Sequence, residues 1–222
     1  MKSWMAPAAA LLCAGSAIAL TQGSAGIGEK LSQNLHVLQS YSWKMRTELK
    51  MEGESKVTSI YQIRFDLSWQ VQKTLVSAPP QPKKARGIKG KKIKQKQEEI
   101  KTLVEALSKI AMSYILPEPE QFQRFLQNAN AWEGQGSTAG STRVEGGGFS
   151  SPHDQVNLYV NNVTKDFQQL SATTELEGNP VSIQSDYRTM EGGPTYMAKM
   201  TVDYPSAGVQ LIVENFDYLR QQ

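Results

Sequence analysis

Residues 41–51 read YSWKMRTELKM and alternate almost strictly between large, mostly apolar side chains and polar ones. Successive side chains of a β-strand point to opposite faces, so each set shares one face. An antiparallel strand with one face on a core and the other in water has this pattern. The stretch therefore predicts a long antiparallel strand whose apolar face carries Tyr41, Trp43, Met45, Thr47, Leu49 and Met51.

The same alternation recurs on both sides of a central break. Residues 57–65 continue it on a second strand after a turn at Gly53, and residues 69–75 continue it on a weaker third. Tight turns rich in Gly and Pro then separate five more predicted strands, at residues 156–160, 170–176, 181–187, 196–204 and 209–213. Strands at this short spacing favour an antiparallel meander.

Helical periodicity appears in three places. Apolar residues recur at helical spacing over residues 28–39 and 100–114, and Pro119 opens a further amphipathic helix. Residues 132–151 are rich in Gly and Ser and predict a loop, with a short strand at 142–145. The predicted fold is α+β: a curved, half-open antiparallel β-barrel with helices covering the concave face, as one domain over 20–222 with a basic loop and helical insert at about 77–131.

The composition excludes several kinds of site. The 222 residues carry a formal charge of +3, with one cysteine, Cys13, and two histidines, His36 and His153. A single thiol allows no internal disulfide and no zinc site with several Cys ligands. No Ser-His-Asp arrangement or carboxylate pair is legible. We therefore expect a protein that is not an enzyme and has no cofactor or metal.

The first 19 residues predict a secretory signal peptide. A basic Lys2 precedes an apolar stretch that ends in the small-residue site Ala17-Ile18-Ala19. Leu12 before Cys13 disfavours a lipoprotein leader. We expect a monomer in the periplasm, exported and not lipidated.

A second feature is a cluster of basic residues between Ser77 and Gln97. No acidic residue occurs from Leu67 to Gln97. Its composition predicts a loop that binds an anionic lipid surface or an acidic envelope protein, or a solvated linker. Nucleic acid is disfavoured because no aromatic side chains are interleaved with the charges. The residues assigned to this anionic-partner loop are Lys83, Lys84, Arg86, Lys89, Lys91, Lys92 and Lys94.

The apolar face of the predicted sheet and the helices above it are the main candidate for ligand binding. A curved sheet that covers its helices loosely leaves an apolar cavity between the two layers, and flexible Met side chains suit ligands of irregular shape. An ordinary filled core is the alternative. The candidate cavity residues are Trp43, Met45, Leu49, Met51, Tyr61, Ile63, Phe65, Leu103, Leu107, Phe122, Phe125, Tyr196 and Met200.

Several short strings, together with the order of the elements, resemble a known family. They are Leu38-Gln39-Ser40-Tyr41, Arg64-Phe65-Asp66, Val71-Gln72-Lys73 and Glu214-Asn215-Phe216-Asp217-Tyr218. Over residues 28–219 the chain resembles the LolA-like carriers of outer-membrane lipoproteins and their relatives, including the lipid-binding domain of the stress regulator RseB.

The resemblance implies a half-barrel with a helical lid and an apolar cavity that holds acyl chains during periplasmic transit, without bond chemistry or a cofactor. It also implies an arginine near the cavity that holds the lid, but Arg46 falls on the polar face of its strand, so this role is not carried over. The expected function is a lipid or lipoprotein carrier or chaperone. The alternative is a non-catalytic envelope sensor or docking module of the same fold.

Overall fold

The structure is a computed structural model that describes residues 16–66, 68, 70–77, 88–133 and 140–221. Within these ranges no helix combines the length and the apolar character needed to cross a membrane. The helices are α1 (Ser16–Leu38), α2 (Ile88–Ile115) and α3 (Pro119–Asn128), with a short 3-10 turn at Pro205–Ala207. The strands are β1 (Tyr41–Met51), β2 (Glu54–Phe65), β3 (Val71–Ser77), β4 (Asn130–Glu133), β5 (Ser141–Gly146), β6 (Gln155–Asn161), β7 (Phe167–Leu176), β8 (Asn179–Thr189), β9 (Thr195–Tyr204) and β10 (Val209–Arg220).

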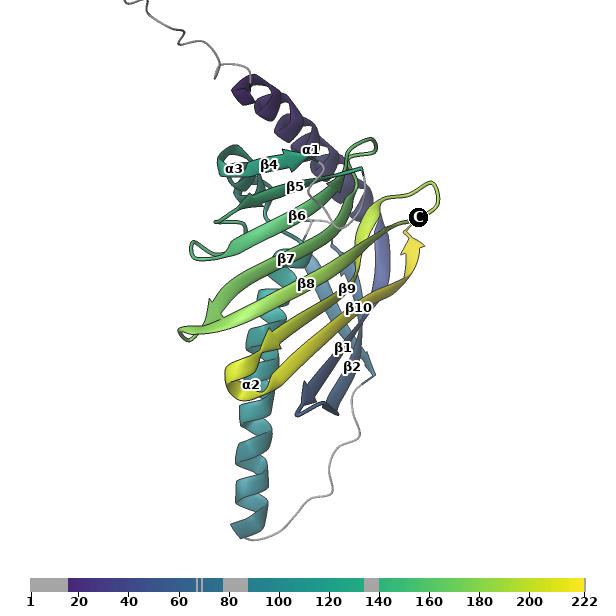
Figure 1. Cartoon of the computed structure of the whole chain (residues 1–222). Coiled ribbons are helices and arrows are strands. Elements are labelled where there is room, and N and C mark those ends of the chain that lie inside the picture. The colour runs from purple at the N-terminus through teal and green to yellow at the C-terminus, as the bar shows by residue number, and fades with distance from the viewer. Residues whose placement is uncertain (1–15, 67, 69, 78–87, 134–139, 222) are drawn as a thin grey trace, which may run out of the picture.

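All ten strands form one antiparallel sheet in the order β3-β2-β1-β10-β9-β8-β7-β6-β5-β4 (Figure 1). The N-terminal strands join the C-terminal meander because β1 pairs with β10 from Met51–Val209 to Tyr41–Arg220. The sheet is open, with β3 at one edge and β4 at the other. The predicted α+β class and the curved antiparallel sheet are confirmed.

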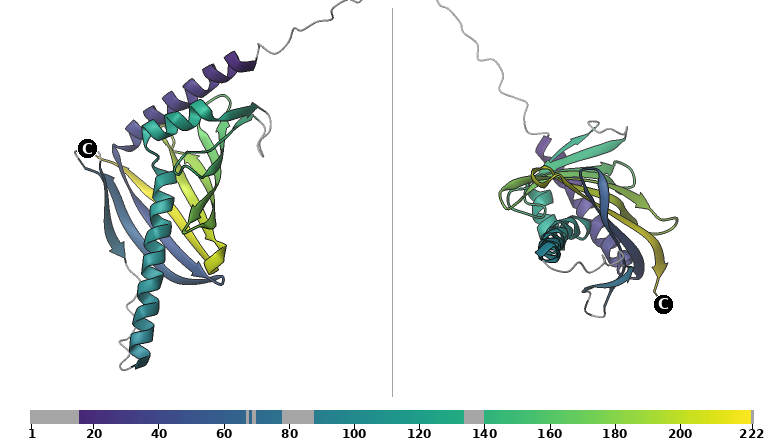
Figure 2. Two further views of the ribbon diagram at one scale, coloured as in Figure 1. Left: turned by 90° about the vertical axis from the view of Figure 1, so that its left-hand side faces the viewer. Right: turned by 90° about the horizontal axis from the view of Figure 1, so that it is seen from below.

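The helices lie on the concave side of the sheet (Figure 2). α2 contacts β9 and β10, while α3 contacts β5 and α1. The N-terminal part of α2 continues past the end of the sheet (Figures 1 and 2). One half of this helix is therefore packed on the sheet and the other half projects from it.

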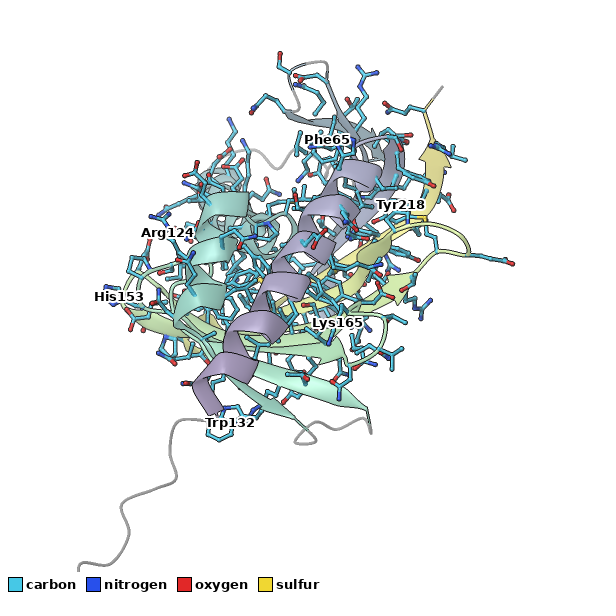
Figure 3. The ribbon with its side chains drawn as sticks, turned by 90° about the horizontal axis from the view of Figure 1, so that it is seen from above. Phe65, Arg124, Trp132, His153, Lys165 and Tyr218 are labelled. Atoms are coloured by element: carbon cyan, nitrogen blue, oxygen red, sulfur yellow. The ribbon has the colours of Figure 1, made fainter. Side chains whose placement is uncertain are left out.

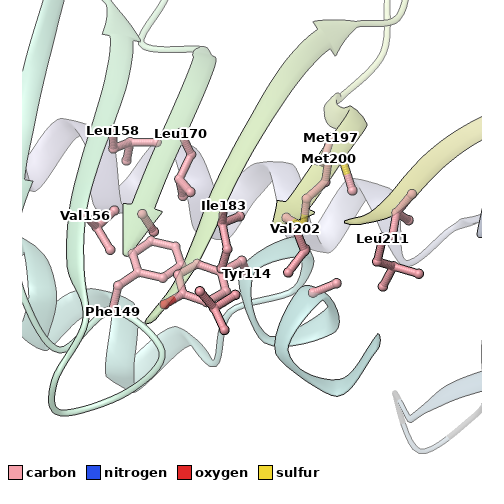
Figure 4. Packing of buried hydrophobic residues seen from close by; sticks show 14 of the residues in the cluster. Tyr114, Phe149, Val156, Leu158, Leu170, Ile183, Met197, Met200, Val202 and Leu211 are labelled. Carbon is pink, nitrogen blue, oxygen red and sulfur yellow. The ribbon is translucent and has the colours of Figure 1, made fainter. Parts of the chain in front are cut away.

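The core fills the space between the sheet and the helices. Tyr114 of α2 stacks on Phe149 with ring centroids 5.5 Å apart, and Phe122 of α3 meets Phe149 edge-on at 5.5 Å. Figure 4 shows Tyr114 and Phe149 beneath the inward side chains of β6 to β8. These rings and the inward strand residues belong to one continuous apolar cluster.

A buried carboxylate fixes the packed half of α2. Asp154 is fully buried and accepts hydrogen bonds from the N–H groups of residues 148, 149, 150 and 151 at 2.7–3.1 Å. The Tyr114 hydroxyl donates a further bond to it at 2.9 Å. Burial and the adjacent carboxylate raise the pKa of Tyr114 above its usual range. Several donors to one buried carboxylate compensate its desolvation and tie α2 to the loop before β6.

Three expectations about local structure are corrected. The first helix begins at Ser16 rather than at residue 28, and positions 88–97 of the expected basic loop are helical. Residues 132–133, expected to be loop, belong to β4, whereas β5 confirms the short strand expected at 142–145. Lys, Gln and Glu are good helix formers even where no apolar stripe marks the segment. The strand β4 is stabilised by pairing with β5, and local composition does not reveal such a pairing.

Gly147 offers a test of the Asp154 loop. A Cβ atom at this position would lie 2.8 Å from the backbone oxygen of Asp154, which no side-chain rotation can relieve. We expect Gly147→Ala to lower the free energy of unfolding by about 2 kcal/mol. Gly26→Ala is the matched control: the site lies in α1 with open space around it, so this change should stabilise the protein by about 0.5–1 kcal/mol. Equal urea midpoints for the two variants would contradict this account.

Candidate ligand-binding surface

Most of the predicted cavity residues lie in the packed core. The structure buries them between sheet and helices with at most 3% of each side chain exposed; they are Trp43, Met45, Leu49, Ile63, Leu107, Phe122, Phe125 and Met200. They share the concave side of the sheet or the facing sides of α2 and α3, as the pattern predicted. Their role in binding a ligand stays a prediction.

The remaining predicted residues are only half-buried. Met51, Tyr61, Phe65 and Leu103 pack against the margin of the core, and Tyr196 is also partly exposed. Tyr61 and Phe65 belong to β2, the second strand from the open edge. The structure therefore separates the predicted set into a filled part and an accessible part.

The accessible part continues onto β3. Val71 pairs with Phe65, and Leu75 pairs with Tyr61, so both lie on the concave side. Exposure rises towards the edge: Ile63 is 0% exposed, Val71 37% and Leu75 52%. We call the concave residues Tyr61, Phe65, Val71, Lys73 and Leu75 the edge patch. It is an apolar surface that the sheet presents beyond its filled core.

The helix α2 carries further apolar side chains at the margin of the core. Ile100, Leu103 and Val104 are half-buried, whereas Leu107, one to two turns later, is fully buried. Residues 94–99 are exposed throughout. The apolar residues of α2 therefore become more exposed towards the N-terminus of the helix. The apolar residues on the concave face of the sheet likewise become more exposed towards β3.

An aromatic cluster borders the edge patch. Trp43 stacks on Tyr218 at 5.4 Å with an interplanar angle of 12°, and Phe65 packs against Trp43 at 5.9 Å. Figure 3 shows that Phe65 and Tyr218 both lie near the C-terminal end of α1. The Trp43 indole donates a hydrogen bond of 3.0 Å to Oδ1 of Asn215, whose amide donates to the Met197 carbonyl at 3.0 Å. The cluster is thereby held in a fixed arrangement.

A bulge in β10 places Tyr218 in this cluster. The β1–β10 register shifts between Ser42 and Lys44, and Asp217 takes a left-handed φ of 53°. One additional residue reverses the side on which the following side chains lie. Asp217 can then pair with Lys44 at 2.9 Å, while Tyr218 stacks on Trp43. The strict alternation of a strand predicts no bulge, so the sequence pattern does not place Tyr218 in the site.

A separate hollow lies between α1 and α3. Its volume is about 510 Å³, within the range of ligand pockets. Sequence reasoning missed it because it depends on how two helices cross. It is lined by Gly28, Leu31, Ser32, Leu35, Glu120, Phe122, Gln123, Arg124 and Gln127. The lining of this hollow shares no residue with the edge patch.

The predicted anionic-partner residues fall in two places. Lys83, Lys84 and Arg86 lie outside the described residues. Positions 89, 91, 92 and 94 (Lys89, Lys91, Lys92 and Lys94) are in the first turns of α2, on the part that projects past the sheet. Lys94 is exposed. The basic segment is thus helical from residue 88 onwards, and its binding role stays a prediction.

Arg46 lies on the convex side of β1, as the pattern predicted. Its guanidinium pairs with Glu48 at 2.9 Å and with Glu214 of β10 at 3.2 Å. His153 is exposed in the loop before β6 (Figure 3). Neither side chain reaches the concave apolar surface.

No family model and no curated protein matches the chain. Among solved structures, the chain is similar to a LolA superfamily protein from Nitrosomonas europaea, with a TM-score of 0.46 and 12% identity over 90% of this chain and 94% of that one. It is also similar to a DUF1329 family protein from Desulfovibrio piger, with a TM-score of 0.44 and 9% identity over 90% and 92% of the two chains. A LolA superfamily protein is thus among the similar structures, as the sequence resemblance predicted, and the likeness concerns the fold alone.

Tyr218 provides a test of the aromatic cluster through alkaline unfolding. Burial, and then the neighbouring Tyr196, raise the pKa of Tyr218 above its usual range. Above roughly pH 10 the unfolded chain loses a proton that folded Tyr218 keeps, so stability falls by about 1.4 kcal/mol per pH unit for this group. We expect Tyr218→Phe to remove that contribution to the pH dependence of the free energy of unfolding. The contributions of Tyr114 and Tyr187, whose pKa values burial also raises, should remain.

Urea unfolding at roughly pH 8 and pH 11 measures the difference. The Tyr218→Phe protein should lose less stability between the two conditions than the unaltered chain does. Identical losses would show that Tyr218 ionises as freely in the folded protein as in water.

Proposed function

We propose that this protein is a non-enzymatic carrier or chaperone that binds an acyl chain of a lipid or lipoprotein at the edge patch, after export to the periplasm. The chain would lie on the concave side of β2 and β3, beside the half-buried apolar residues of α2. The single observation that carries the proposal is the rising exposure of apolar concave residues from the filled core to Val71 and Leu75 at the edge of the sheet.

The shape of the surface favours a long, narrow apolar ligand. The patch follows β2 and β3 and ends at the filled core, so a ligand meets it as a strip rather than as a deep pocket. Each CH2 group taken out of water contributes about 0.8 kcal/mol. About ten buried groups would thus contribute about 8 kcal/mol, against an association cost of about 4 kcal/mol or more. That balance supports reversible binding, which a carrier needs.

The role of the basic segment of α2 distinguishes the alternative function, a docking or sensor module. Five lysines between residues 89 and 96 are followed by Glu98 and Glu99, and the described part of the segment is exposed. A carrier keeps lipid binding when this segment is neutralised. A docking module would lose its acidic partner while any lipid binding stays unchanged.

Leu75→Gln tests the proposed site directly. Burying half of a leucine side chain under a ligand contributes about 1 kcal/mol, so the affinity for an acyl probe should fall about fivefold. The measurement is the fluorescence titration of the full chain with cis-parinaric acid, together with native mass spectrometry for lipid that copurifies from membranes. Leu219→Gln is the matched control, because Leu219 is exposed on the convex side, opposite Ser42 of β1.

A second control addresses the hollow between α1 and α3. Ser32→Trp places a large ring in that hollow and should leave probe binding unchanged. Loss of binding in Ser32→Trp with retention in Leu75→Gln would move the site to the hollow. Absence of both copurified lipid and probe binding would refute the carrier function.

A further inference from the structure

We infer that the acyl ligand carries an anionic group, a carboxylate or a phosphate, which pairs with the ammonium of Lys73 at the outer margin of the edge patch. The inference rests on the proposed function and adds the chemical class of the ligand. It concerns a residue that no sequence pattern had marked as a site.

Lys73 lies on the edge strand β3, between apolar neighbours on the same side. It pairs with Ile63 across the sheet, which places it on the concave side, and Val71 and Leu75 flank it on the same side of β3. Its Nζ lies 3.8 Å from the centroid of the Tyr61 ring. The ammonium is therefore held against the ring face at the point where the concave surface reaches the edge of the sheet.

The charge of Lys73 has no counter-charge in the described part of the chain. Three of the five basic residues on β1 and β2 differ in this respect: Lys44 pairs with Asp217, Arg46 with Glu48 and Glu214, and Lys56 with Glu54. Although the Lys73 residue is exposed overall, its ammonium lies close to the apolar surface, and this desolvation lowers its pKa. The Tyr61 ring offers only partial compensation.

An anionic head group would supply the missing partner. An ion pair gains strength where water is partly excluded, and an acyl chain on the edge patch would exclude water from one side of Lys73. The head group would stay at the solvent side, on the edge strand, while the chain extends towards the core and α2. A neutral amphiphile would cover Lys73 with no compensating charge, so the site should discriminate against it.

The test compares three ligands with the same chain: dodecanoate, dodecyl phosphate and dodecanol, titrated calorimetrically into the full protein. We expect the better of the two anions to bind about tenfold more tightly than dodecanol. In Lys73→Met the difference should shrink to about twofold, whereas Lys73→Arg should preserve it. Lys199→Met is the control with the same charge change, since Lys199 is exposed on the convex side, opposite Glu214.

The outcomes separate this inference from the proposed function. A preference for dodecanoate or for dodecyl phosphate that depends on Lys73 supports the inference and identifies which anion fits. Equal binding of dodecanol and both anions, or a preference that survives Lys73→Met, overturns the inference and leaves the carrier function standing. Binding of none of the three ligands overturns both. Dodecanol affinity that is retained or increased in Lys73→Met shows that the variant is folded.

Discussion

The pairing of β1 with β10 is the constraint on which the rest of the structure depends. It joins the N-terminal strands to the C-terminal meander in one antiparallel sheet, along the whole length of both strands. The helices α2 and α3 enter the chain after β3, yet α2 contacts β9 and β10, and α3 contacts β5. The pairing therefore places β2 and β3 beyond β9 and β10, the strands on which α2 packs. An exposed, apolar concave edge is a direct consequence of this topology.

The concave side accordingly has two parts with different physical roles. In the filled part, Tyr114, Phe122 and Phe149 pack against inward strand residues, and the buried Asp154 holds α2 in place through its hydrogen bonds. This part supplies stability. In the open part, Val71 and Leu75 remain in contact with water, and Lys73 has an aromatic ring but no described carboxylate beside it. An exposed apolar surface of this kind is typical of a site where a ligand or partner binds.

Sequence reasoning predicted the strong local signals and missed those that depend on pairing. The predicted strand over residues 41–51 and the five predicted C-terminal strands were confirmed. A half-buried strand needs apolar side chains on one face and polar ones on the other, so its sequence alternates between the two. The helical start of the basic segment was missed, because a solvated helix has no apolar stripe to reveal it. The position of Tyr218 needed a bulge, and the significance of Lys73 needed its pairing with Ile63. Which predicted cavity residues are buried and which stay accessible depends on how far along the sheet α2 packs. No local sequence pattern contains that information.

Hydrogen exchange of the full chain, with and without a saturating acyl ligand, tests the central claim most directly. Amides of an edge strand exchange readily because one side of the strand lacks a partner, so β3 should be among the least protected strands in the free protein. The account predicts that the ligand slows exchange in β2, β3 and the part of α2 around residues 100–104, and leaves α1 and α3 unchanged. Slower exchange confined to α1 and α3, around the hollow between them, would contradict it.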